Sequence, residues 1–247
     1  MEEIDFVDVT TLLSDTQAVV MSNDDVVIVA FRGTEPNAED FITDLGVVRV
    51  PVPVWSALPP APPFPMVHSG FYNAQSQAYS DVKARIDSHM SSGKTLWLTG
   101  HSLGAALATM VAYNLEKVDE EMVWGVYTYG SPRTGDPVWS DLYNNMRFGA
   151  FFFNPAGDAP NLDLGDKTHR WVNNTDLIPA LPGVVLDYRH VGTLHHIDAT
   201  GAVVAETPSV VPLPSSLMYP DGDHYGYPYK IFHAMPDAFR EGLPSPE

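Results

Sequence analysis

Two apolar runs near the start of the chain are separated by a short polar stretch. Residues 16–21 and 26–31 are rich in apolar, β-branched side chains, whereas residues 22–25 read Ser-Asn-Asp-Asp. Strands favour β-branched residues and turns favour Asn and Asp, so this pattern predicts a β-hairpin. Further along, residues 51–65 contain seven prolines, which exclude a helix and indicate an extended surface segment.

From residue 70 onwards, the spacing of the apolar side chains switches between helical and strand-like. Residues 70–92 have apolar positions at steps of three and four, which predicts a helix that Gly93 would end. Short apolar runs predict buried strands. The remaining segments are, in order, a strand at 95–99, a helix at 105–118, a strand at 122–129, a helix at 136–147, an irregular loop at 149–169, a strand at 171–173, a hairpin at 188–205, a proline-rich loop at 207–220 and a helix at 227–234.

Strands therefore alternate with helices through the middle of the chain, between residues 66 and 175. This order predicts an α/β fold in which a mainly parallel central sheet is covered by helices on both faces. The 247 residues show no internal repeat and no linker. We therefore expect a single domain over residues 1–247.

Composition narrows the classes of function. The 13 basic and 31 acidic residues give a net charge of −18, which repels nucleic acid and anionic membranes. No apolar stretch is long enough for a transmembrane helix, and the acidic start lacks the basic region of a secretory signal. The chain has no cysteine, which excludes disulfides and thiolate sites. A cytoplasmic protein and the mature form of a secreted protein both fit these features.

The segment Gly100-His101-Ser102-Leu103-Gly104 fits the G-x-S-x-G pattern of a nucleophile elbow. In such an elbow a strand bends sharply into a helix and holds the serine hydroxyl at the apex. Glycine is needed on both sides because a side chain there would collide with the strand or the helix. An apolar run precedes the motif and alanines follow it, which favours Ser102 as a nucleophile over a Gly-Ser turn without chemistry. The N–H of Leu103 would then lie at a helix N-terminus, where negative charge is favoured.

A serine nucleophile needs a base, and the base needs an acid that orients it. In this class of elbow the acid and then the histidine follow the serine along the chain. Asp176 directly follows a predicted strand and is the first candidate for the acid, with Asp158 and Asp163 as alternatives. His224 lies in a loop ahead of the last predicted helix and is the first candidate for the base, with His233 second.

Three further histidines, His190, His195 and His196, fall in the predicted hairpin, where packing or exposure explains them better than catalysis. His195 and His196 are neighbours, and neighbouring strand residues point to opposite faces of a sheet. We therefore expect no metal ion shared between them.

Several segments besides the elbow form a characteristic series. They are VAFRGT at 29–34, DFITDL at 40–45, VHSGFYNA at 67–74, TGHSLGAALA at 99–108, YGSPRTGD at 129–136, RWVNNTDLIPALP at 170–182, YRHVG at 188–192 and DHYGYPY at 223–229. In this order and spacing the chain resembles the class 3 lipases, the fungal-lipase-like branch of the α/β-hydrolases. The resemblance covers most of the chain and is far more specific than any single motif. The chain departs from the family pattern at Ala105, where many members have another glycine, and it lacks the cysteines that form disulfides in secreted fungal members.

The resemblance implies an α/β-hydrolase fold with Ser102 as nucleophile, Asp176 as acid and His224 as base. It also implies an oxyanion hole formed by Thr34 together with the N–H of Leu103. No metal or organic cofactor is expected for this chemistry.

The resemblance further implies that residues 35–45, which follow the oxyanion strand, form a lid. Phe41, Ile42 and Leu45 could form one apolar side of this segment. An outward-facing lid would dock on an oil–water interface, whereas an amphipathic helix packed on the core is the simpler alternative. Because basic residues are few, such docking would be apolar rather than electrostatic.

The expected activity is that of a serine hydrolase that cleaves carboxylic esters through an acyl-enzyme, with a triacylglycerol lipase as the first expectation. A soluble carboxylesterase, a feruloyl-type esterase and a phospholipase A1 would use the same triad and stay open as alternatives. A non-catalytic binding protein on this fold is a further alternative, against which the Ser, Asp and His candidates argue. The expected partner is a lipid or another ester substrate, not a nucleic acid.

Overall fold

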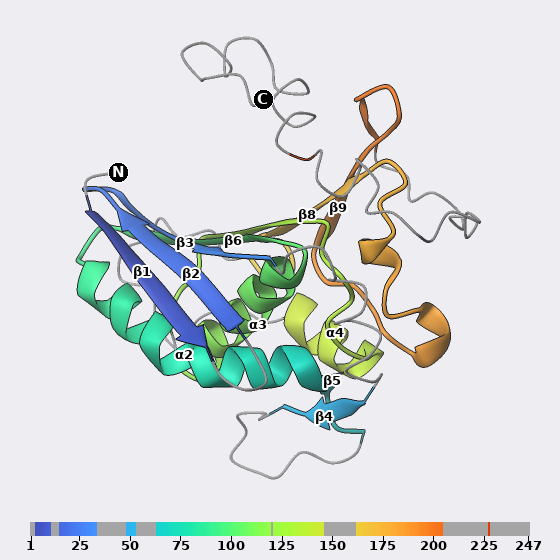
Figure 1. Cartoon of the computed structure of the whole chain (residues 1–247), viewed down its shortest axis with the longest axis horizontal. Helices are drawn as coiled ribbons and strands as arrows, with labels where there is room; N and C mark the ends of the chain where they lie inside the picture. Colours follow the sequence, from blue (N-terminus) through green and yellow to red (C-terminus); the bar gives the residue numbers. More distant parts are fainter. Residues whose placement is uncertain are drawn as a thin grey trace.

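The computed structural model describes residues 3–10, 15–33, 48–52, 63–119, 121–145, 162–204 and 227. Within these residues eight strands form one sheet in the order β1-β2-β3-β6-β7-β8-β9-β10 (Figure 1). The strands are β1 (Glu3–Thr10), β2 (Asp15–Ser22), β3 (Val26–Phe31), β6 (Thr95–His101), β7 (Gly125–Tyr129), β8 (Thr168–Asn173), β9 (Thr193–Ile197) and β10 (Val203–Val204). Neighbours from β3 to β9 are parallel, and the outer pairs are antiparallel. The predicted, mainly parallel sheet is confirmed.

Three helices of the described residues lie on one side of this sheet (Figure 1). They are α2 (Ser69–His89), α3 (Leu103–Lys117) and α4 (Pro137–Asn144). Helix α2 packs against β1 and β2, and α3 packs against β3, β6 and β7. A separate ribbon pairs β4 (Arg49–Pro51) with β5 (Met66–His68), and two short 3-10 turns, η1 (Ile178–Ala180) and η2 (Val184–Leu186), follow β8. The predicted helical layer is thus described for one face of the sheet. No helix in the described part of the chain is both long and apolar enough to cross a bilayer.

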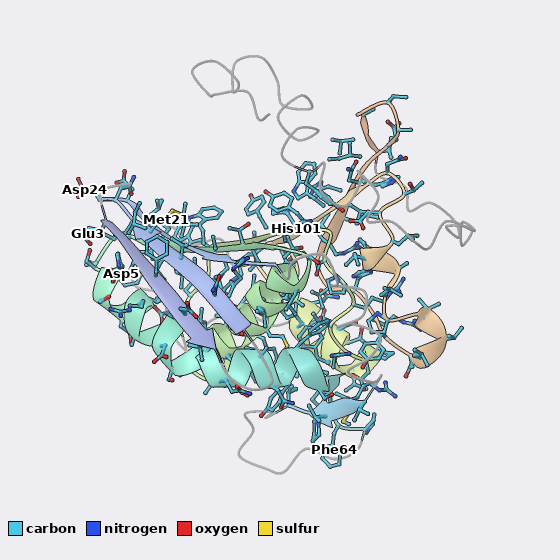
Figure 2. The ribbon with its side chains drawn as sticks, viewed as in Figure 1. Glu3, Asp5, Met21, Asp24, Phe64 and His101 are labelled. Carbon is cyan, nitrogen blue, oxygen red and sulfur yellow. The ribbon has the colours of Figure 1, made fainter. Side chains whose placement is uncertain are left out.

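The core lies between this sheet and the helices. Strands β3 and β6 pair so that Val29 and Leu98 lie side by side, and both are fully buried. Every second residue of β6 shares this burial, as expected for a strand with one face packed against helices. The opposite face carries larger, half-buried side chains, among them Trp97, Tyr127 and Trp171. In Figure 2, Met21 and His101 project from this second face.

Several element boundaries differ from the prediction. The hairpin at 16–31 is confirmed as β2 and β3, but the structure adds β1 as a partner of β2 at the sheet edge. Helix α2 ends at His89, ahead of Gly93, because Met90 already has an extended backbone and Ser91 accepts a turn hydrogen bond from Lys94. The late hairpin is also shorter than predicted and begins at Thr193.

The sheet topology brings the candidate residues to one edge. Strand β7 lies between β6 and β8 and is parallel to both, so all three strands end on the same side. Ser102 directly follows β6, and Asp176 comes shortly after β8. Carboxyl ends of parallel strands are where α/β folds bind their ligands.

Candidate active site

Ser102 lies at a sharp bend between β6 and α3. Its backbone has φ 55° and ψ −124°, in a region that L-residues rarely adopt. A Cβ on Gly100 would lie 2.2 Å from the carbonyl oxygen of Gly104, and a Cβ on Gly104 would lie 2.3 Å from the carbonyl oxygen of Phe31. Both contacts are far shorter than van der Waals distance. The bend therefore requires glycine on both sides, as the motif predicts.

The side chain of Ser102 is buried, with 1% of its surface exposed, and its hydroxyl has no hydrogen-bond partner among the residues that the structure describes. A buried polar group without a partner is uncommon and often has a chemical role. Its backbone is well anchored, because its N–H donates to the carbonyl of Tyr129 at 2.9 Å. Leu103 is the first residue of α3, so its N–H belongs to the helical turn whose amides lack acceptors within the helix.

Asp176 lies beyond β8 at the same edge of the sheet and is 2% exposed. Its Oδ1 accepts a hydrogen bond from the N–H of Ile178 at 3.0 Å, and its Oδ2 accepts one from the hydroxyl of Tyr227 at 2.5 Å. The Tyr227 hydroxyl accepts in turn from the N–H of Asn173 at 3.0 Å. The Asp176 carboxylate is therefore held in one orientation by donors from two separate parts of the chain.

Tyr227 itself is buried against the second face of the sheet. Its ring makes edge contacts with His101 and Tyr129, at centroid distances of 5.5 and 6.2 Å. Burial, together with the negative charge of Asp176, raises the pKa of its hydroxyl well above the ordinary value. The hydroxyl thus remains a donor to the carboxylate across the physiological pH range. The sequence marks Tyr227 only through its place three residues after His224, and this contact was not predicted.

Several predicted site residues lie outside the described residues. These are Thr34, the lid segment 35–45, Asp158, His224 and His233. Asp163, the other alternative for the acid, lies ahead of β8 and therefore at the opposite end of this strand from Asp176. Of the described candidates, the structure places Ser102, Leu103 and Asp176 at one edge of the sheet.

The histidines of the late segment have structural partners. The half-buried His190 residue donates from Nε2 to the carbonyl of Pro179 at 2.8 Å. Burial, with Arg170 and Arg133 nearby, lowers its pKa well below the ordinary value, so this ring is neutral. His195 stacks on Trp171, while the buried His196 contacts the carbonyl of Asn174. These two rings lie on opposite faces of β9, and no group of three potential metal ligands occurs within the described ranges.

Comparisons with known protein sequences identify relatives of this chain. A sequence model for the family described as Lipase (class 3) matches residues 28–186. The chain is 27% identical over 190 residues to the lipase of Rhizomucor miehei. This alignment covers 74% of this chain and 45% of the relative. It is 30% identical over 189 residues to phospholipase A1-II 1 of Oryza sativa. This alignment covers 70% of this chain and 43% of the relative. The chain thus spans less than half the length of these two curated relatives.

Solved structures show the same fold. The triacylglyceride lipase of Rhizomucor miehei has a TM-score of 0.61 at 24% identity and covers 81% of this chain and 69% of its own. A second structure, of a triacylglycerol lipase whose catalytic centre is described as a serine protease triad, has a TM-score of 0.57 at 26% identity and covers 79% and 67%. The predicted α/β-hydrolase fold is confirmed.

Proposed function

The chain belongs to the class 3 lipase family, and on this basis we propose that it is a serine hydrolase that cleaves the carboxylic ester bonds of lipids. The observation that carries the proposal is the Ser102 hydroxyl, which is buried at a strained bend between β6 and α3 and lacks a hydrogen-bond partner within the described ranges. Strained backbone of this kind persists only where the surroundings enforce it, and it concentrates at functional sites.

In the proposed mechanism, Ser102 Oγ attacks the ester carbonyl while His224 takes its proton. Asp176 orients the imidazole and stabilises its charged form. The contacts of Asp176 support this role, because Ile178 and Tyr227 fix both carboxylate oxygens before any substrate arrives. A fixed acid gives the base one orientation, which lowers the reorganisation needed in the transition state.

The oxyanion that forms on the carbonyl would be held by the N–H groups of Leu103 and Thr34. Each such donor typically lowers the barrier by about 3 kcal/mol. The alcohol leaves with a proton from His224, and water then releases the acyl group from Ser102 by the reverse proton path. All proposed steps use side chains and backbone donors of this chain.

The proposed substrate is an acylglycerol, as for the Rhizomucor relative and the solved triacylglycerol lipase. A phospholipid ester is the second candidate, favoured by the 30% identity to the Oryza phospholipase A1. A further relative, 31% identical over 134 residues, is a secreted mono- and diacylglycerol lipase of Fusarium solani that covers 53% of this chain and 34% of its own. This relative favours a mature exported protein over a cytoplasmic one. Docking on an oil–water interface through residues 35–45 stays a prediction, because this segment lies outside the described residues.

A fluorophosphonate probe tests the nucleophile directly. The folded protein should form a covalent adduct on Ser102, located by peptide mass spectrometry, and Ser102→Ala should form none. Absence of an adduct in the folded wild-type protein would favour a non-catalytic binding protein. Rates on emulsified triacylglycerol, on phosphatidylcholine and on a short soluble ester then rank the substrate classes. Hydrolysis of the soluble ester alone would replace the lipase proposal with an esterase.

A further inference from the structure

An exposed apolar turn lies beyond β8. Val184, Val185 and Leu186 form η2 and expose 54%, 91% and 42% of their surfaces. They account for three of the ten large apolar residues that are exposed in the described part of the chain, and two more, Val48 and Phe64, flank the β4–β5 ribbon. Single exposed apolar residues are ordinary, whereas three in succession on a turn are not. Phe64 is labelled beside this ribbon in Figure 2.

The turn lies at the same edge of the sheet as Ser102. Arg133, which follows β7 at this edge, donates from its guanidinium to the carbonyls of Ala180 and, at 2.8 Å, Pro182. Its backbone N–H donates to the carbonyl of Leu181 at 2.7 Å. The segment between Asp176 and η2 is therefore fastened to the loop beyond β7.

Both ends of η2 are fixed as well. The N–H groups of Leu186 and Asp187 donate to the carbonyls of Gly183 and Val184, each at 2.9 Å. Arg49 of the ribbon donates to the carbonyl of Asp187 at 3.2 Å and lies 3.6 Å from its carboxylate. The three apolar side chains are thus presented on a prearranged backbone, which reduces the entropy lost when they bind a surface.

We propose that η2 docks on a lipid surface of no net charge by inserting Val184, Val185 and Leu186. The inference deepens the proposed function and rests on it, because docking at this edge would bring Ser102 to its substrate. The net charge of the chain favours a lipid surface without net charge as the partner of η2. The net charge of −18 repels anionic surfaces, and Asp187, the acidic residue of the turn, is already paired with Arg49. Apolar insertion into a neutral or zwitterionic surface does not meet this charge repulsion.

Binding of the full chain to phosphatidylcholine vesicles, measured by flotation, tests this docking. The experiment uses Ser102→Ala protein so that hydrolysis cannot alter the vesicles. Adding Val185→Ser should weaken partitioning about tenfold, because a buried valine side chain is replaced by a polar one. The matched control is Val118→Ser, since Val118 is also exposed, at 42%, but caps the opposite end of α3 from Ser102. This control should bind as before.

Equal binding of the Val185→Ser and parent proteins would overturn the proposal. So would an equal loss in the control, or stronger binding to vesicles that also contain anionic phosphatidylglycerol. The binding assay is independent of catalysis. If the wild-type chain hydrolyses no ester but Val185→Ser still weakens vesicle binding selectively, the hydrolase proposal fails and the docking surface stands. If esters are hydrolysed and vesicle binding is unchanged, the docking proposal alone fails.

Discussion

The hydroxyl of Tyr227 donates a hydrogen bond to Asp176 across 51 positions of sequence. Asp176 is the proposed acid, and Tyr227 comes three residues after His224, the proposed base. A residue close in sequence to the proposed base thus donates to the proposed acid. Tyr227 is buried against His101 and Tyr129, so its hydroxyl lies next to the strand that leads into the elbow.

Replacing Tyr227 by phenylalanine should affect both stability and catalysis. The change removes the donor to Asp176 and the acceptor of the Asn173 N–H, both in buried surroundings. Loss of these two buried hydrogen bonds should lower the free energy of unfolding by about 1–3 kcal/mol. With Asp176 held less firmly, kcat should fall about tenfold, which corresponds to about 1.4 kcal/mol of barrier. Urea unfolding and ester hydrolysis measure the two effects.

Tyr143→Phe is the matched control for this experiment. The Tyr143 hydroxyl is also buried and lies 2.9 Å from the Thr168 hydroxyl, at the start of β8 rather than its end. Its loss should reduce stability while leaving kcat near wild type. An equal fall in kcat for the two variants would show that Tyr227 acts only through general stability.

The hydroxyl of Ser102 should be dispensable for folding. It is buried, and no described residue forms a hydrogen bond with it, so Ser102→Ala removes a polar group that the described part of the fold leaves unsatisfied. We expect ester hydrolysis to vanish while the unfolding free energy stays the same or rises by up to about 1 kcal/mol. Thermal melting of both proteins at the same pH checks this expectation. A marked drop in melting temperature would show that the hydroxyl stabilises the fold.

The need for glycine on both sides of Ser102 was predictable from sequence, because it arises from residues that are consecutive in the chain. A strand of alternating burial, a bend and a helix of small residues follow one another without interruption. The position of Asp176 shortly after a strand was likewise predictable from the apolar pattern, and its role as the acid stays a prediction. The hydrogen bond between Tyr227 and Asp176 was not predictable, because it joins two residues that are 51 positions apart in sequence.

Strand β1 was missed for a related reason. Its residues Asp5 and Asp8 interrupt the apolar pattern, and one side of an edge strand needs no partner. Its antiparallel pairing with β2, from Glu3 opposite Ser22 to Thr10 opposite Asp15, is shown only by the structure. The segment also exposes Phe6, so its hydrophobicity does not follow burial. Edge strands are therefore predicted less well than the central strands, whose apolar runs reflect packing on the helices.

Alanine at Gly104 should disrupt the elbow more than alanine elsewhere. The added methyl would lie 2.3 Å from the Phe31 carbonyl oxygen, and this backbone cannot move without separating α3 from β3. We expect a loss of about 3 kcal/mol or more, typical of severe overpacking. Gly183→Ala is the control, because its nearest neighbour would be 3.7 Å away and its φ of −60° suits alanine. If both variants melt at the same temperature, the close packing of the elbow does not limit stability.

The neutral, half-buried residue His190 should make the fold sensitive to acid. Burial together with Arg170 and Arg133 lowers its pKa well below the ordinary 6.5, so below about pH 6.5 the unfolded chain binds a proton that the folded chain does not. Stability therefore rises with pH and falls on acidification, by up to about 1.4 kcal/mol per pH unit from this one group. His190→Gln places an amide nitrogen near the position of Nε2, so it can still donate to the Pro179 carbonyl but cannot titrate. Urea unfolding at about pH 7 and about pH 5.5 should show a smaller acid loss in this variant. An identical loss in wild type and variant would assign the acid sensitivity to other groups, such as the partly exposed His169 and His195, whose pKa values burial also lowers.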